Sequence, residues 1–78
     1  RAAQAGEEAL AARVAVLSRR EREVCDRVAR GMLNKQIAVE LGISESAVRI
    51  YRGKGVEKLG VGSTAELARL LERLDRGA

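Results

Sequence analysis

Histidine, proline, phenylalanine and tryptophan are absent from this chain of 78 residues, which has one cysteine and one tyrosine. A lone cysteine cannot close an internal disulfide, and a lone thiol without histidine cannot supply the ligand set of a zinc site. We therefore expect no metal, and a reducing cytoplasm suits the protein. Without bulky aromatic residues the core must consist of Leu, Ile, Val and Ala, which favours packed helices over a sheet. The sequence predicts an all-α fold.

Other absences narrow the function. The chain has no histidine, no cluster of carboxylates and no glycine-rich phosphate loop, so we predict no catalytic residue, no enzyme activity and no cofactor. It has no apolar run approaching membrane-spanning length and no signal-peptide pattern, so we expect neither insertion nor secretion. Because it begins with Arg1, we expect a piece of a longer protein. The excess of 15 Lys and Arg over 11 Asp and Glu gives a net charge of +4, which favours an anionic partner only modestly.

The N-terminal part of the chain predicts a linker followed by a capped helix. Residues 1–17 are rich in alanine, and apolar residues recur at helical spacing. We interpret 1–17 as a helical interdomain linker segment, in preference to a coiled-coil or partner-binding segment, and 18–78 as the domain proper. Ser18 and Glu21 match a capping box, and Gly31 should close the helix that begins there.

Residues 34–59 carry the pattern of two helices joined by a glycine turn. Gly42 follows Leu41 where the first helix must end, and glycine accepts the left-handed conformation found at such ends. Ser44 then provides an N-cap for the second helix. Apolar residues lie where two steeply crossing helices must touch, and Ala38 is small at the crossing. This order of residues predicts a helix-turn-helix, the motif that places its second helix in the DNA major groove.

The second helix of this motif should have a core face and a DNA-reading face. Residues three or four positions apart share one face of a helix. The core face then carries Val48, Tyr51, Gly55 and Leu59, and the DNA-reading face carries Ser46, Arg49, Ile50 and Gly53. Arg49 can donate two hydrogen bonds to guanine, and Ile50 can meet a thymine methyl. The flanking cations Lys35, Arg52 and Lys54 should contact phosphates. The expected partner is double-stranded DNA.

The segments LSRREREV, ARGMLNKQIAVELGIS, AVRIYR and EKLGVGSTAEL resemble the LuxR/FixJ-type (GerE) helix-turn-helix family over residues 17 to 74. The resemblance implies a four-helix bundle at the C-terminus of a bacterial transcription regulator, either a response regulator or a protein with a ligand-binding domain. It also implies homodimers on repeated DNA sites, formed in solution or only on DNA, with the fourth helix at the contact. RNA polymerase is then a further partner to expect.

The chain departs from the family pattern within the recognition helix. Ala47, Tyr51 and Gly55 stand where members usually have Thr, His and a bulky aliphatic residue. Gly55 leaves no side chain on the core face. The sequence allows Val56 to rotate inward, or the helix to bend or end early near Gly53.

The last segment should form a helix with two faces. Ser63 to Glu66 match a second capping box, opening a helix to about Leu74. Its apolar stripe, which should pack on the domain, is Leu67, Leu70, Leu71 and Leu74. The opposite, outward face of this helix carries Ala65, Ala68, Arg69 and Glu72. These residues form either a self-complementary dimer patch or an ordinary solvated face.

Two other functions fit a helix-turn-helix. A promoter-recognition domain of a sigma factor would lack the KLGVGSTAEL segment. A protein-interaction module that retained the fold would have a neutral outer face on the second motif helix, whereas Arg49, Arg52 and Lys54 give that face a positive rim.

Overall fold

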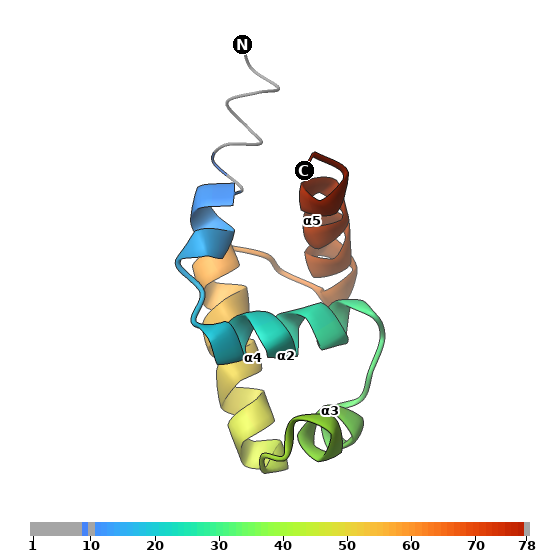
Figure 1. The fold of residues 1–78 in the computed structure, drawn as a ribbon. Coiled ribbons are helices and arrows are strands. Elements are labelled where there is room, and N and C mark those ends of the chain that lie inside the picture. The colour runs from blue at the N-terminus through green and yellow to red at the C-terminus, as the bar shows by residue number, and fades with distance from the viewer. Residues whose placement is uncertain (1–8, 10, 78) are drawn as a thin grey trace.

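A computed structural model gives the fold of residue 9 and residues 11–77, and the side chains of residues 9 and 11–74 (Figure 1). Residues 1–8 and 10 of the predicted linker lie outside these residues. The elements are a helical stretch at 11–15, α2 (Arg19–Ala29), α3 (Asn34–Leu41), α4 (Glu45–Leu59) and α5 (Thr64–Gly77), and the described part of the chain contains no strand. The all-α prediction is therefore confirmed. Within the described residues, no helix has both the length and the apolarity needed to cross a bilayer.

Helix α2 is the element on which the others pack. It lies across the middle of α4 and also contacts α3 and α5, while α3 packs beside the N-terminal end of α4 (Figure 1). Ser18 Oγ accepts from the Glu21 amide at 3.1 Å, and Glu21 Oε1 accepts from the Ser18 amide at 2.9 Å, so the first capping box is confirmed. Gly31 follows the helix at a φ of 86°, as predicted.

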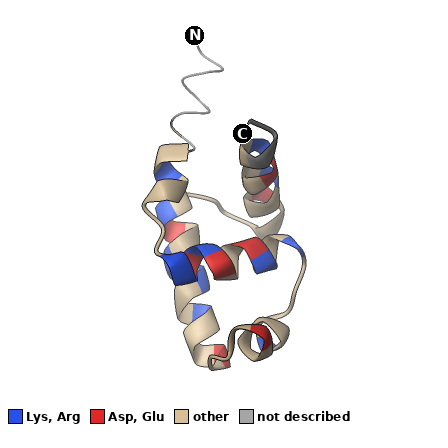
Figure 2. Ribbon diagram, in the orientation of Figure 1, with Lys and Arg blue, Asp and Glu red and all other residues tan. Residues whose placement is uncertain are grey.

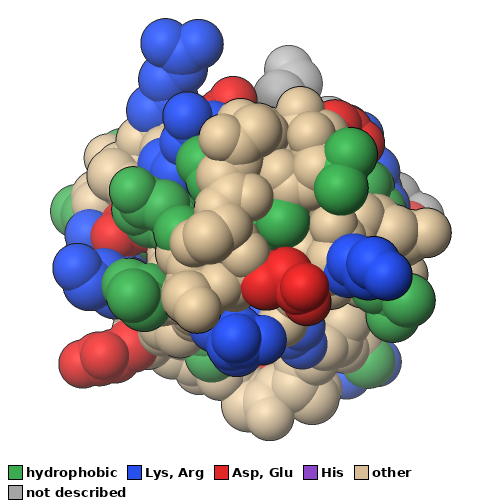
Figure 3. All heavy atoms as spheres, turned by 90° about the horizontal axis from the view of Figure 1, so that it is seen from below, with side chains coloured by type: hydrophobic (Ala, Val, Ile, Leu, Met, Phe, Trp, Pro, Cys, Tyr) green, Lys and Arg blue, Asp and Glu red, His purple; other side chains and the backbone are tan. Residues whose placement is uncertain are grey.

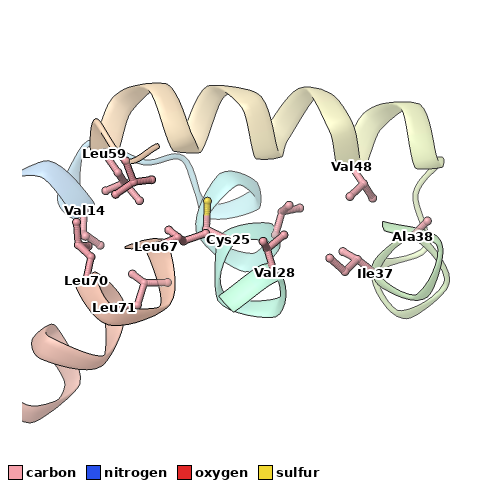
Figure 4. Close-up of a cluster of buried hydrophobic side chains, with 12 residues drawn as sticks. Val14, Cys25, Val28, Ile37, Ala38, Val48, Leu59, Leu67, Leu70 and Leu71 are labelled. Carbon is pink, nitrogen blue, oxygen red and sulfur yellow. The ribbon is translucent and has the colours of Figure 1, made fainter. Parts of the chain in front are cut away.

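The turn between α3 and α4 has the predicted form. Gly42 caps α3 in the left-handed conformation at a φ of 68°, which its missing Cβ allows. Ser44 Oγ then accepts from the Ala47 amide at 3.0 Å and starts α4. Val48 is fully buried and points toward Ile37 and Ala38 of α3, which fixes the angle between the two helices (Figure 4).

Gly55 does not interrupt α4, which continues to Leu59. Gly55 is buried, and the Sγ of Cys25 on α2 lies against it, in the place that a Cβ would occupy. In Figure 4 the sulfur of Cys25 points toward α4. Of the alternatives open from the sequence, early termination near Gly53 is wrong. Val56 is half-buried against the core, but the space beside Gly55 is filled from another helix.

The last helix differs from its prediction in two respects. It runs to Gly77 and not to Leu74, because the intervening Asp and Arg are compatible with a helix. Ser63 Oγ accepts from the Glu66 amide at 3.1 Å, but Glu66 Oε2 accepts from the amide of Gly62 at 2.9 Å and not from that of Ser63. The Ser63 half of the second capping box is thus confirmed and the Glu66 half is wrong.

The stripe of leucines on α5 is confirmed as part of the core. Leu67, Leu70 and Leu71 are buried and Leu74 is half-buried. Val14, from the segment interpreted as a linker, is 9% exposed and belongs to the same core cluster, near Leu59 and Leu70 (Figure 4). Residues 11–15 therefore pack on the domain, although the assignment of 1–17 as an interdomain linker stays a prediction.

Candidate nucleic-acid interface

The outward face of α4 is where the sequence predicted it. Val48 and Leu59 are fully buried, Gly55 is buried and Tyr51 is half-buried, so this side of the helix is the core face. On the other side all four predicted base-contacting residues, Ser46, Arg49, Ile50 and Gly53, are exposed. Ile50 is 56% exposed and lies next to Arg49 on this face. The outward face of α4 thus presents hydrogen-bond donors and an apolar side chain together.

Cations dominate the charge on and around this face. Lys and Arg recur along α4, whereas basic and acidic residues alternate on α2 (Figure 2). Lys35, in the first turn of α3, and Lys54 are both exposed. Among the described residues the carboxylates form ion pairs with Arg20, Arg22, Arg27 and Lys58, and none pairs with Arg49, Lys35 or Lys54. These three cations therefore keep their charge available for an anionic partner.

Arg52 lies in a different environment from the other predicted phosphate ligands. It is half-buried, its Nη1 donates to Asn34 Oδ1 at 3.1 Å, and its Nη2 donates to Thr64 Oγ1 at 3.2 Å. Both acceptors are neutral, so the guanidinium keeps its full charge. Sequence reasoning missed this arrangement, because Asn34 and Thr64 lie far from Arg52 along the chain. That Arg52 contacts a phosphate stays a prediction.

An open groove of about 500 Å³ runs beside the outward face of α4. Its walls come from α4 and from the N-terminal ends of α3 and α5, and Arg49, Arg52 and Gly53 lie along it. Apolar side chains of Val28, Val56 and Leu67 also line it. A Cβ at Gly53 would meet no atom within 4 Å, so the helix is open to close approach here. The groove is too open to enclose a small molecule, and it suits an extended surface better.

Figure 3 shows the end of the molecule formed by α3 and the start of α4. Basic and apolar side chains lie side by side there, with acidic side chains among them. The exposed apolar residues Leu33 and Val39 belong to α3 and its N-cap, at 67% and 79% exposure. Such a mixture differs from a uniformly basic surface that would attract any polyanion, and it fits an interface with some selectivity.

The predicted dimer patch on α5 is only partly exposed. Ala65, Arg69 and Glu72 are exposed, whereas Ala68 is half-buried beside Leu71 and residues of α2. Glu72 already takes part in an interaction within the chain. The patch and its role in a dimer stay predictions.

The C-terminal end of α4 is held by bonds that the sequence did not reveal. Arg13 Nη1 donates to the Leu59 carbonyl at 2.9 Å, and Lys58 Nζ donates to Glu21 Oε1 at 2.7 Å. The hydrogen bond from Lys58, followed by that from the Ser18 amide, holds the pKa of Glu21 below its ordinary value of 4.5. Burial raises the pKa of Cys25 to about 11, so its thiol stays protonated and behaves as a small core hydrophobe, as predicted. These bonds fix the orientation of α4 and leave its outer face open.

The helix-turn-helix, its buried inner face and its exposed, positively charged outer face define a DNA-binding domain of the helix-turn-helix class. The chain belongs to the family described as bacterial regulatory proteins, luxR family (GerE), which it matches over residues 15–71. Domains of this family bind DNA and regulate transcription, and the resemblance found in the sequence is confirmed.

The relatives include bacterial regulators. The chain is 49% identical over 53 residues to the transcriptional regulatory protein UhpA of Escherichia coli, covering 68% of this chain and 27% of that protein. It is 48% identical over 58 residues to nodulation protein W of Bradyrhizobium diazoefficiens and to the response regulator protein TodT of Pseudomonas putida, in each case covering 74% of this chain and 26% of the relative. The chain thus spans about a quarter of the length of these relatives.

Solved structures share the fold closely. The response regulator StyR superposes with a TM-score of 0.87 at 39% identity, covering 91% of this chain and 36% of that one. Full-length FixJ from B. japonicum gives a TM-score of 0.83 at 40% identity, and the match covers 92% of this chain and 36% of the FixJ chain.

Proposed function

We propose that this domain binds double-stranded DNA sequence-specifically by placing α4 in the major groove. The observation that carries the proposal is the exposure of Arg49 and Ile50 on the face of α4 opposite the buried Val48. Arg49 reads a guanine through its O6 and N7, and Ile50 contacts a thymine methyl. Ser46 and Gly53 lie on the same face, Ser46 as a hydrogen-bonding group and Gly53 as a point of close approach.

Lys35 and Lys54 contact phosphates on either side of the groove. Their ammonium groups are exposed and not paired with carboxylates of the described residues. Such contacts fix the register and make affinity depend on salt without reading the sequence.

The domain acts as the C-terminal effector of a response regulator. This regulator is cytoplasmic and is not an enzyme, and it engages RNA polymerase at promoters. Support comes from the relatives, which are about four times as long as the matched segment and include proteins named as response regulators. A homodimer forms through α5, with Ala65 and Arg69 exposed at the contact, Ala68 at its edge and Glu72 on the same face. Two recognition helices about 34 to 36 Å apart would then enter successive major grooves.

Selection from a randomised duplex library tests the proposal. The domain should enrich one motif, in two copies about one helical turn apart if it dimerises, and affinity for that duplex should fall steeply with salt. Sedimentation with duplexes of one and two half-sites gives the stoichiometry. Absence of enrichment, with no affinity even at low salt, would favour a protein-interaction module instead.

A further inference from the structure

The middle of α4 contains two glycines, Gly53 and Gly55. Val48 and Leu59 are fully buried, but the buried position between them is Gly55, which has no side chain. Gly53 is exposed, and nothing lies within 4 Å of the position of its Cβ. Cys25 packs against Gly55 on the inner side, but glycine disfavours a helix, so the two glycines give this part of the recognition helix a weak helical preference.

Arg52 lies directly before this stretch and joins it to two other helices. Its Nη1 donates to Oδ1 of Asn34, the first residue of α3, at 3.1 Å. Its Nη2 donates to Oγ1 of Thr64, the first residue of α5, at 3.2 Å. One guanidinium therefore connects α3, α4 and α5 at the rim of the groove that Arg49 also lines.

The chemistry of this bridge requires arginine. A guanidinium is planar and directs its donors along fixed lines, so it can hold two acceptors on different helices at once. A lysine ammonium in the same place is a compact point charge on a flexible stem, and it would keep the charge without fixing the geometry.

We propose that Arg52 is a positioning residue that sets the base discrimination of Arg49 through the hydrogen bonds that it makes to Asn34 and Thr64. By tying α4 to the starts of α3 and α5 beside the two glycines, it fixes the rotation of the recognition helix, and with it the direction in which Arg49 projects. A bidentate contact to guanine depends on that direction. This inference rests on the proposed DNA-binding function.

The test uses two duplexes. The first is the duplex that the wild-type domain selects. The second differs from it at the single base pair at which Arg49→Ala no longer distinguishes one base from another. Affinity for both is measured over a range of salt concentrations for Arg52→Lys, Arg52→Ala and Thr64→Val. Because Ser63 caps α5 through its own hydroxyl, Thr64→Val removes the acceptor and leaves the cap in place. Arg73→Ala, an exposed arginine further along α5, controls for the loss of a charge. Thermal unfolding identifies any variant that does not fold.

We expect Arg52→Lys, Arg52→Ala and Thr64→Val each to lower discrimination about fivefold or more, which is the scale of a weakened bidentate contact. The salt dependence of Thr64→Val and Arg52→Lys should match that of the wild type, and Arg73→Ala should discriminate normally. Full discrimination in Arg52→Lys and Thr64→Val would overturn the proposal. So would an Arg52→Ala variant whose salt slope drops by about 0.9 with discrimination intact, since that is the mark of a lost phosphate contact. If the wild-type domain itself selects no duplex, the proposed function fails first, and the two failures are distinguishable.

Discussion

The sulfur of Cys25 on α2 lies in the space that a Cβ at Gly55 of α4 would need. The close approach of the two helices depends on both residues, because the thiol fills the gap that the glycine leaves. A larger residue at position 55 has room only if position 25 becomes smaller, so the two positions should behave as a pair.

Gly55→Ala should destabilise the domain, although alanine is the better helix former. Overpacking a core costs about 1 to 3 kcal/mol, which exceeds the gain of up to about 1 kcal/mol from helix propensity. Gly53→Ala is the matched control, because its Cβ meets nothing within 4 Å and should stabilise the domain. Urea unfolding of both variants checks this, and equal gains in stability would show that Cys25 does not fill the space.

The pair should also show coupling in a double-mutant cycle. Cys25→Ala alone leaves a cavity, but together with Gly55→Ala the new methyl group occupies part of it. The double variant should therefore be more stable than the sum of the single effects by about 0.5 to 3 kcal/mol. Combining Cys25→Ala with Gly53→Ala should instead be additive.

Acid should weaken the fold partly through Glu21. Its pKa is lowered in the folded state by Lys58 and the Ser18 amide, so its contribution is complete above the ordinary value of 4.5. The contribution is lost as the pH falls through the lowered folded-state pKa. Glu21→Gln should thus lower the melting temperature at pH 7 more than at pH 3. Glu23→Gln, which weakens the longer surface contact to Arg20 at 3.4 Å, should have little effect at either pH. A Glu21→Gln deficit independent of pH would contradict this role.

Residues before Ser18 should contribute to stability, although the sequence places them in a linker. Val14 is 9% exposed within the core, whereas Val16 is 61% exposed. Truncating the buried side chain by Val14→Ala should cost about 1 to 2 kcal/mol, and Val16→Ala should cost almost nothing. Thermal unfolding separates the two, and equal stability of both variants would place the domain boundary after Val14.

Features set by neighbouring residues could be predicted from the sequence. The caps at Ser18 and Ser44 and the turn at Gly42 depend on a few adjacent residues, and the two faces of α4 follow from its periodicity. The filling of the space beside Gly55 by Cys25 and the bonds from Arg52 to Asn34 and Thr64 could not be predicted. They join side chains 12 to 30 positions apart, and such contacts depend on how the helices cross.

The central claim is that the outer face of α4 reads DNA, with Arg49 as the reader of one base pair. The most direct measurement is the affinity of the wild-type domain and of Arg49→Ala for the selected duplex and for all its single base-pair variants. The account predicts that Arg49→Ala loses about 1 to 3 kcal/mol of discrimination at one base pair and keeps it elsewhere. An Arg49→Ala profile identical to that of the wild type at every position would contradict it.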